Sequence, residues 1–238
     1  TIIRENETKA IEDLNLNLFE GQIYGLAGIS GNGQTELAEF LMGLHKPSKG
    51  NISVNKKILS KITPQNFRSH GIASIPAERY IYGLAGDLSV MENFSISQID
   101  HQDYGNSYWI NNKSMFDKTN KVIKDFNILG AFPNTKARIL SGGNAQKLVL
   151  ARELSSDSKI LVAHSPTRGL DVRACVAIHE NLRKAANLGV AVLLISEDLD
   201  EIMSVSDYIG VINRGRIVGE FSSPADRHEL GKLMTDHA

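Results

Sequence analysis

The sequence predicts an α/β fold, in which a mainly parallel sheet is covered by helices and carries an antiparallel β lobe and an inserted helical lobe. Short apolar runs of strand length alternate with longer segments whose apolar residues recur at helical spacing. The length of 238 residues suits one such domain better than two independent ones. We expect a single functional unit over 1–238, with a core of 1–84 and 141–238 and a helical insert at 85–140.

The first element of the core is a small antiparallel lobe, followed by a buried strand at 23–27 that enters a glycine-rich loop at 28–33. From Thr35 onward apolar residues recur at helical spacing, which predicts a helix that ends before Pro47. The lobe is predicted from Ile2, Ile3, Ile11, Leu14, Leu16 and Phe19, and the helix from Leu37, Leu41 and Leu44.

The middle of the chain, 85–140, has an irregular helical pattern with polar stretches at 101–106 and 111–113, which predicts the inserted lobe. A helix from about Asn144 and a strand at 160–163 follow. Next come a helix, a buried strand at 190–195 and a closing hairpin around 213–215. The helix before that last strand is expected to place Val172, Val176, His179, Leu182 and Ala186 on one face.

Composition limits the classes of function. With 26 Lys and Arg against 27 Asp and Glu, the formal net charge of −1 gives no general attraction to nucleic acid or to an anionic membrane. The single cysteine, Cys175, excludes an intrachain disulfide, is compatible with a reducing cytoplasm, and is expected to pack on a helix face. No apolar run reaches the roughly 18 residues that cross a bilayer, and no signal-peptide pattern opens the chain. A soluble fragment of a longer protein is expected.

The glycine-rich stretch reads Gly28-Ile29-Ser30-Gly31-Asn32-Gly33-Gln34-Thr35, which matches the phosphate-loop pattern GxxxxGK[ST] except at the lysine. The backbone N–H groups and the following helix would bind nucleotide phosphates, and Thr35 would be a weak Mg²⁺ ligand. Because Gln34 removes a cation, binding is expected to weaken about 10- to 100-fold. A glycine-rich strand-to-helix turn without a ligand is the alternative for the loop alone.

A second motif, Leu140-Ser141-Gly142-Gly143-Asn144-Ala145-Gln146-Lys147, opens the next helix. It resembles the LSGGQ signature of ABC-transporter ATPases, in the LSGGNxQK form of simple-sugar and nucleoside importers. The resemblance implies a P-loop NTPase (RecA-like) fold in which two domains sandwich ATP. It makes Ser141, Gly142, Gly143 and Gln146 a site that acts in trans, and makes Asp171, in Arg168-Gly169-Leu170-Asp171, part of the D-loop at the dimer seam.

The chain departs from this family at the positions that serve its own ATP. His164 and Ser165 stand where the aspartate for Mg²⁺ and the glutamate for water are expected, Glu197 replaces the switch histidine, and Ala77 replaces the Q-loop glutamine. No aromatic for adenine stacking precedes Phe19. Losing a general base alone costs about 10²- to 10⁴-fold in rate. We expect no catalytic residues in the domain's own site; His164 as a metal ligand is less expected than a structural histidine.

The pattern is similar to the second, degenerate halves of simple-sugar and nucleoside importer ATPases. It implies an ATP hydrolase at the level of the assembled transporter, with ATP and Mg²⁺ weak or absent at the domain's own site. The implied partners are a second ABC ATPase domain, fused or separate, a membrane permease reached near 78–93, and indirectly a solute-binding protein. The expected location is peripheral, on the cytoplasmic face of the cell membrane, without nucleic acid. The alternative is a non-hydrolysing ATP-binding half or a purely structural one.

An apolar stretch in the same region has two readings. Leu88, Val90, Met91 and Phe94 would either receive the permease or form a core face, because both uses show the same helical spacing. Core packing is the favoured interpretation.

Overall fold

The computed structural model describes residues 1–4, 6–99, 104–106 and 109–235. Its contacts divide the chain into two compact units. The first unit comprises 1–74, 158–165 and 179–238, and the second comprises 75–157 and 166–178. The predicted insert, 85–140, lies wholly within the second unit.

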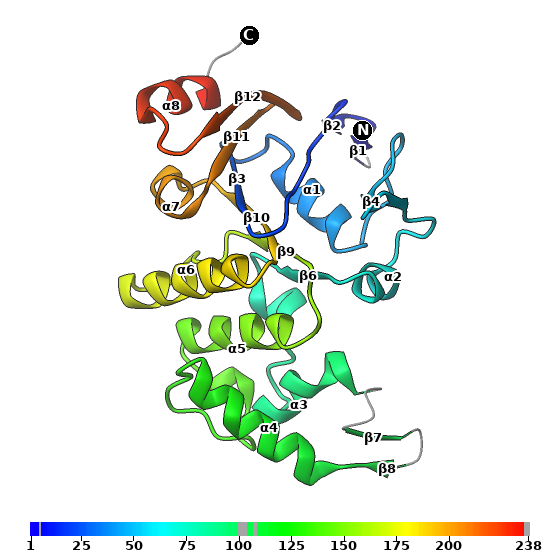
Figure 1. Ribbon diagram of the computed structural model, residues 1–238, viewed down its shortest axis with the longest axis vertical. Helices are drawn as coiled ribbons and strands as arrows, with labels where there is room; N and C mark the ends of the chain where they lie inside the picture. Colours follow the sequence, from blue (N-terminus) through cyan, green and yellow to red (C-terminus); the bar gives the residue numbers. More distant parts are fainter. Residues whose placement is uncertain (5, 100–103, 107–108, 236–238) are drawn as a thin grey trace. The chain divides into compact units, whose positions relative to one another are not determined.

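A six-stranded sheet organises the first unit (Figure 1). The central pairs are parallel, because β10 pairs in parallel with both β3 and β9, and β3 also pairs in parallel with β11. The edge strand β12 runs antiparallel to β11. The mainly parallel sheet predicted from the sequence is therefore confirmed. In spatial order the strands are β12 (Arg216–Ser222), β11 (Tyr208–Asn213), β3 (Ile23–Ala27), β10 (Ala191–Ser196), β9 (Ile160–His164) and β6 (Ile72–Ile75).

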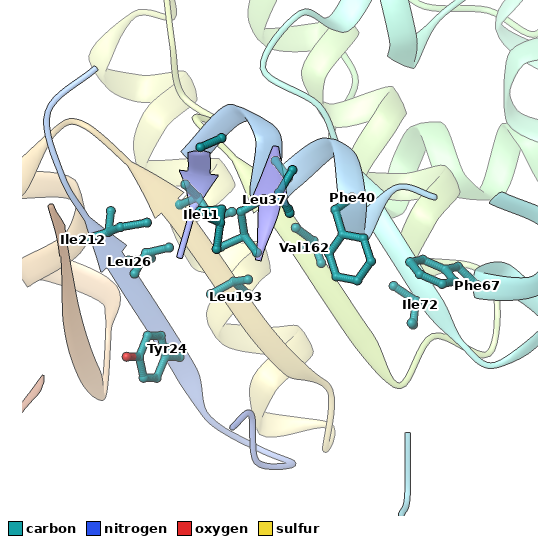
Figure 2. Close-up of a cluster of buried hydrophobic side chains, with 14 of the residues drawn as sticks. Ile11, Tyr24, Leu26, Leu37, Phe40, Phe67, Ile72, Val162, Leu193 and Ile212 are labelled. Carbon is teal, nitrogen blue, oxygen red and sulfur yellow. The ribbon is translucent and has the colours of Figure 1, made fainter. Parts of the chain in front are cut away.

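Helices cover both faces of this sheet, as the continuous apolar runs of β3 and β10 require. On one face, Leu37 and Ala38 of α1 (Gln34–Leu41) belong to the same buried cluster as Leu26 and Leu193 (Figure 2). On the other face lies α7 (Leu199–Val205), since a β carbon built at Gly25 would be 2.9 Å from Ile202. The central strands β3 and β10 are thus buried along their whole length, whereas the edge strand β12 is exposed at alternate residues.

Smaller elements complete the first unit. They are β1 (Ile2–Ile3), β2 (Lys9–Ile11), β4 (Ser53–Val54), β5 (Lys57–Ile58), α2 (Pro64–Ser69) and α8 (Arg227–Thr235). The hairpin predicted at 213–215 is confirmed, with Arg214 and Gly215 at φ 46 and 76 in its two-residue turn.

Two sequence predictions for the first unit are wrong. The apolar residues from Leu14 to Phe19 form no strand: Leu14 and Leu16 pack on the core from an extended segment, while Phe19 is 62% exposed. The first helix ends at Leu41, so Leu44 lies beyond it and is exposed. Apolar spacing alone therefore overestimated both elements, because it does not report whether the backbone has a hydrogen-bonding partner.

The second unit is mainly helical (Figure 1). Its helix α3 packs against α4 and α5. A short β7–β8 pair was not predicted, and residues 101–103 of the polar stretch 101–106 lie outside the described residues. The elements are a π-helical turn η1 (Arg79–Gly83), α3 (Val90–Ser95), η2 (Ile96–Gln98), β7 (Gly105–Asn106), β8 (Trp109–Ile110), α4 (Asn112–Asp125), η4 (Ala137–Ile139), α5 (Gly142–Leu154) and the start of α6 (Val172–Asn187).

The face predicted for α6 is partly wrong. Val172 and Val176 are 80% and 51% exposed, whereas Ala174 and Ile178 are buried. Leu182 is buried as predicted. Cys175 lies beside this buried face, half-buried, with its Sγ 3.9 Å from the carbonyl oxygens of both Thr167 and Leu170.

Of the apolar stretch that follows η1, Val90 and Phe94 are buried, which supports the core interpretation for these two. Leu88 is 37% exposed. In the ranges that the structure describes, no helix is both long and apolar enough to span a bilayer.

Candidate functional site

Three of the predicted site segments meet at one edge of the sheet in the first unit. Ala27 at the end of β3 is level with Ser196 at the end of β10, and His164 at the end of β9 is level with Ile195. Because these strands are parallel, the segments that follow them leave the same edge, where α/β folds bind ligands. The glycine-rich loop, Ser165 and Glu197 are thereby brought together.

The loop itself has the backbone shape that phosphate binding requires. Gly33 has φ +103, and a β carbon there would lie 2.3 Å from the carbonyl oxygen of Ala10, so only glycine fits. Helix α1 begins at Gln34, directly after it. The first N–H groups of α1 lack intrahelical acceptors and point out of the helix start, where an anion binds. The backbone part of the predicted site is therefore compatible with a phosphate group.

Gln34 supplies no charge to this loop and folds back onto it. Its side chain is buried, at 4% exposure, and Nε2 donates to the carbonyl oxygen of Ile29 at 3.0 Å. Its Oε1 is buried and accepts no hydrogen bond from the described residues. A β carbon at Gly28 would be 2.7 Å from Nε2, so the amide lies directly over the start of the loop.

Asn32 uses its polar groups within the protein. Its Nδ2 donates to the carbonyl oxygen of Ile212 at 3.4 Å, and its Oδ1 accepts from the backbone N–H of Arg214 at 3.1 Å. The carbonyl oxygen of Asn32 accepts from the N–H of Gly215 at 3.0 Å. The loop is thus fastened to the β11–β12 hairpin through a residue that the loop pattern leaves unspecified.

The end of β9 lacks the acidic pair that Mg²⁺ and water activation need. His164 is half-buried, and Ser165 is held at φ 44 while its N–H donates to the carbonyl oxygen of Ile195 at 2.8 Å. Mg²⁺ prefers oxygen ligands, carboxylates above all, so an exposed Thr35 hydroxyl without a carboxylate fits the ion poorly. Over the described ranges, no three His, Cys, Asp or Glu side chains gather as a metal site.

The segment after β10 is built around a helix cap. Glu197, at the switch position, is exposed, and no hydrogen bond links it to another described residue. Its neighbour Asp198 is the N-cap of α7, where Oδ1 accepts from the N–H groups of Asp200 at 2.9 Å and Glu201 at 3.2 Å. The structural role here belongs to Asp198, and Glu197 is left free to face solvent.

Replacing Asp198 by alanine is expected to lower the free energy of unfolding by about 1 kcal/mol, because α7 loses its cap. Urea denaturation of the purified chain measures the change. Glu197→Ala is the matched control and should leave the unfolding midpoint nearly unchanged. A larger loss for Glu197→Ala than for Asp198→Ala would contradict this assignment.

In the second unit, the predicted signature forms the start of α5. Ser141 is its N-cap, is exposed, and its Oγ accepts from the Asn144 side chain at 3.0 Å. The Asn144 Oδ1 accepts from the N–H of Leu129 at 2.9 Å. The Oγ of Ser141 also accepts from the backbone N–H of Asn144 at 3.5 Å. A hydroxyl and the first backbone N–H groups of a helix can together bind an anion, and Ser141 presents its hydroxyl at the surface.

The other predicted residues of this unit lie beside the signature or within it. Asp171 is exposed and accepts from the N–H of Ala174 at 3.0 Å, so it caps α6. Gln146 is 1% exposed, which places its side chain inside the unit instead of on the signature's outer surface. Ala77, half-buried before η1, carries no polar group.

A separate cavity of about 460 Å³ lies at the other end of the sheet, lined in part by Tyr24 and Glu220. Burial, and then the hydrogen bond to Glu220, raise the pKa of Tyr24 above its usual value, so its hydroxyl stays protonated and donates to Oε1 at 2.7 Å. None of the predicted site residues lines this cavity.

Comparison with known proteins decides the family. A family model described as ABC transporter matches residues 11–168, more than half of the chain, including the glycine-rich loop and the signature. The chain belongs to the ABC transporter family. Both motifs quoted from the sequence are thus parts of an ABC-type domain, and the resemblance inferred from them is confirmed.

Relatives and solved structures agree with this ABC assignment. A glucose import ATP-binding protein of Haloferax volcanii is 39% identical over 95% of this chain and 42% of its own length. A guanosine import ATP-binding protein of Bacillus subtilis is 38% identical over 98% of this chain and 46% of its own. The chain therefore spans less than half the length of either relative. A dimeric ATP-binding cassette bound to ADP and phosphate aligns with a TM-score of 0.76 at 22% identity, over 91% of this chain and 92% of that one, which confirms the predicted P-loop NTPase fold.

Sequence reasoning missed one residue of this ABC domain. Arg79 lies in η1, and its Nε donates to Gln146 Oε1 at 3.1 Å. In the sequence, Arg79 lies two residues after the Q-loop position and is followed by Tyr80 and Tyr82, a pattern that identifies it only as a charged residue near aromatic ones. Nothing local indicated that its partner lies on the signature helix.

Proposed function

We propose that this chain is a nucleotide-binding domain of an ABC importer for a simple sugar or a nucleoside. The observation that carries the proposal is a contrast between the two units: the start of α5 retains an exposed Ser141 as its N-cap, whereas Gln34, directly after the glycine-rich loop, is uncharged and buried. The domain then works mainly on the ATP of a partner domain. The import names of its relatives support the substrate class.

In this mechanism the chain supplies donors. The Ser141 hydroxyl and the first N–H groups of α5 would bind the terminal phosphate of ATP held by the partner domain, and the positive end of the helix would stabilise charge on that phosphate. Asp171 would meet the partner at the seam. Mg²⁺ and the attacking water would be served by the partner's side chains, because His164 and Ser165 offer no carboxylate.

Transport requires that the movement by which the two domains close is transmitted to a membrane permease. We assign this contact to the region 78–93, on the cytoplasmic face of the membrane. Three consecutive apolar or aromatic side chains in η1 support the assignment, since Tyr80, Ile81 and Tyr82 are 45%, 70% and 54% exposed. A solute-binding protein would act on the permease from outside, without touching this chain.

The domain's own loop is expected to bind ATP weakly, with an affinity well short of the submicromolar range. Restoring the cation by Gln34→Lys should tighten binding about 10- to 100-fold, because a hydrogen bond from a charged donor replaces one from a neutral amide. Isothermal calorimetry with ATP and Mg²⁺ measures both affinities, and Gln34→Ala is the matched control. Submicromolar binding by the unmodified chain would contradict the degenerate-site assignment.

A purely structural half of the dimer is the second candidate. It is favoured by the bonds of Asn32 to the β11–β12 hairpin, which keep the loop in shape without a ligand. The two candidates differ in ATP hydrolysis by the assembly: only the leading proposal requires Ser141. Activity that survives blockage of the signature would favour the structural role.

A further inference from the structure

The turn η1 lies between the two segments that the proposed function assigns to a partner's ATP. It begins two residues after Ala77 and spans Arg79–Gly83. The signature motif begins at Leu140 and the D-loop at Arg168, far along the chain, yet both are bonded to this one turn. All of these residues belong to the second unit.

Arg79 makes the two decisive contacts. Its Nε donates to the side-chain oxygen of Gln146 in α5 at 3.1 Å, and its Nη2 donates to the backbone carbonyl oxygen of Arg168 at 2.5 Å. The remaining guanidinium nitrogen, Nη1, would lie 3.2 Å from a β carbon built at Gly142. One planar group thus reaches the helix of the signature, the backbone of its first glycine and the D-loop.

Other residues of η1 are bonded to the signature motif and to α5. The hydroxyl of Tyr80 donates to the carbonyl oxygen of Leu140, the first residue of the signature motif, at 3.4 Å. At the other end, Nη1 of Arg152 in α5 donates to the carbonyl oxygen of Gly83 at 2.7 Å. The turn is therefore bonded to α5 through Arg79 at its start and Gly83 at its end, and to Leu140 through Tyr80, which leaves Arg79 little freedom to change partners.

Gln146 connects Arg79 to the signature motif. It is 1% exposed, so its side chain cannot reach a partner domain directly. Its oxygen accepts from an arginine whose other bond goes to the D-loop. The contribution of Gln146 to a site in trans would accordingly pass through Arg79.

We propose that Arg79 is a positioning residue that fixes the signature helix and the D-loop at one relative position, so that both are presented together to the ATP of a partner domain. The inference rests on the proposed function. Arginine suits this task because its rigid fork donates in two directions at once, whereas lysine is a single flexible point charge. Ala77 carries no polar group, and Glu78 reaches only Arg168, through an exposed ion pair of 3.5 Å. Arg79 is the side chain of this segment that donates to both the signature helix and the D-loop.

The test uses the assembled protein that contains this chain and its intact partner ATPase domain. Arg79→Ala should lower kcat for ATP hydrolysis about 10- to 100-fold, since small misplacement of a positioning group costs that much. KM for ATP should stay within about 2-fold, because the partner's own loop holds the nucleotide before closure. Arg79→Lys should recover part of kcat.

Two variants at Gln146 separate positioning from folding. Gln146→Glu keeps an acceptor for Arg79 and should retain most of kcat, whereas Gln146→Leu removes it and should resemble Arg79→Ala. The double variant with Arg79→Ala and Gln146→Leu should be no slower than either single one, because the two residues act as a unit. Arg138→Ala, which breaks an exposed pair with Asp87, is the control for loss of an arginine in this unit.

The outcomes are distinct. Unchanged kcat in Arg79→Ala, with Ser141→Arg inactive, overturns the role of Arg79 and leaves the proposed function intact. If Ser141→Arg is also fully active, both fail. A fall in kcat that is matched by equal losses in Gln146→Glu and Gln146→Leu overturns the inference, because the hydrogen bond would then be irrelevant.

Discussion

Ser141→Arg in this chain is expected to abolish ATP hydrolysis by its assembly with an intact partner domain, with a loss of at least about 100-fold in kcat. Ser141 is exposed at the N-cap of α5. Under the proposed function, the phosphate of the partner's ATP approaches its hydroxyl and the first N–H groups of the helix closely. A long side chain at this position fills the space that the phosphate needs. Steady-state phosphate release measures the effect.

Gln34→Ala is the matched change in the other motif. It should alter hydrolysis by less than about 2-fold, since Gln34 is buried in a loop that we assign no turnover. The contrast between the two variants tests the proposal that this domain works mainly on the ATP of its partner. Equal sensitivity to both would show that the chain's own loop takes part in turnover.

Arg152→Met is expected to lower the free energy of unfolding by about 3–5 kcal/mol, because it removes one partner of a buried ion pair. Glu153 is completely buried, and Arg152, 7% exposed, donates from Nε to its Oε1 at 2.8 Å. The same variant removes the donor to the carbonyl oxygen of Gly83. Chemical denaturation of the chain, followed by circular dichroism, gives the change.

A paired variant tests the cause of that loss. With Arg152→Met combined with Glu153→Leu, no carboxylate remains to be neutralised, and much of the stability should return. Recovery should stop short of the starting value because the Gly83 carbonyl still lacks its donor. Arg227→Met, at an exposed pair with Asp200, should change stability little. An equally large loss in the paired variant would show that the ion pair is not the reason.

The local features of the fold were predictable because their signals are local. The order of strand, glycine-rich loop and helix from Ile23 onward follows from a short apolar run, a fixed glycine spacing and a helical repeat. The hairpin at Arg214 and Gly215 follows from its turn residues. Helix faces were less certain: Val172 and Val176 obey the repeat of α6 and still face solvent.

The interior of the candidate site was not predictable in the same way. Arg79 meets Gln146 across 67 positions of sequence and Arg168 across 89, and Asn32 meets Arg214 across 182. A single sequence contains the partners but not the pairings, which depend on how the helices and strands pack in three dimensions. For the same reason the sequence shows that Gln34 replaces a lysine, but not that its side chain donates to the carbonyl oxygen of Ile29.

The hydrogen bonds from Asn32 to the β11–β12 hairpin bear on how many nucleotide cycles each round of import requires. A glycine-rich loop whose shape is maintained by its own hydrogen bonds does not need to bind and release a nucleotide for the surrounding fold to be maintained. Under the proposed function, such a half would contribute a constant surface while the partner alone passes through binding, hydrolysis and release. One nucleotide cycle, and not two to be kept in step, would then set the pace of each round of import.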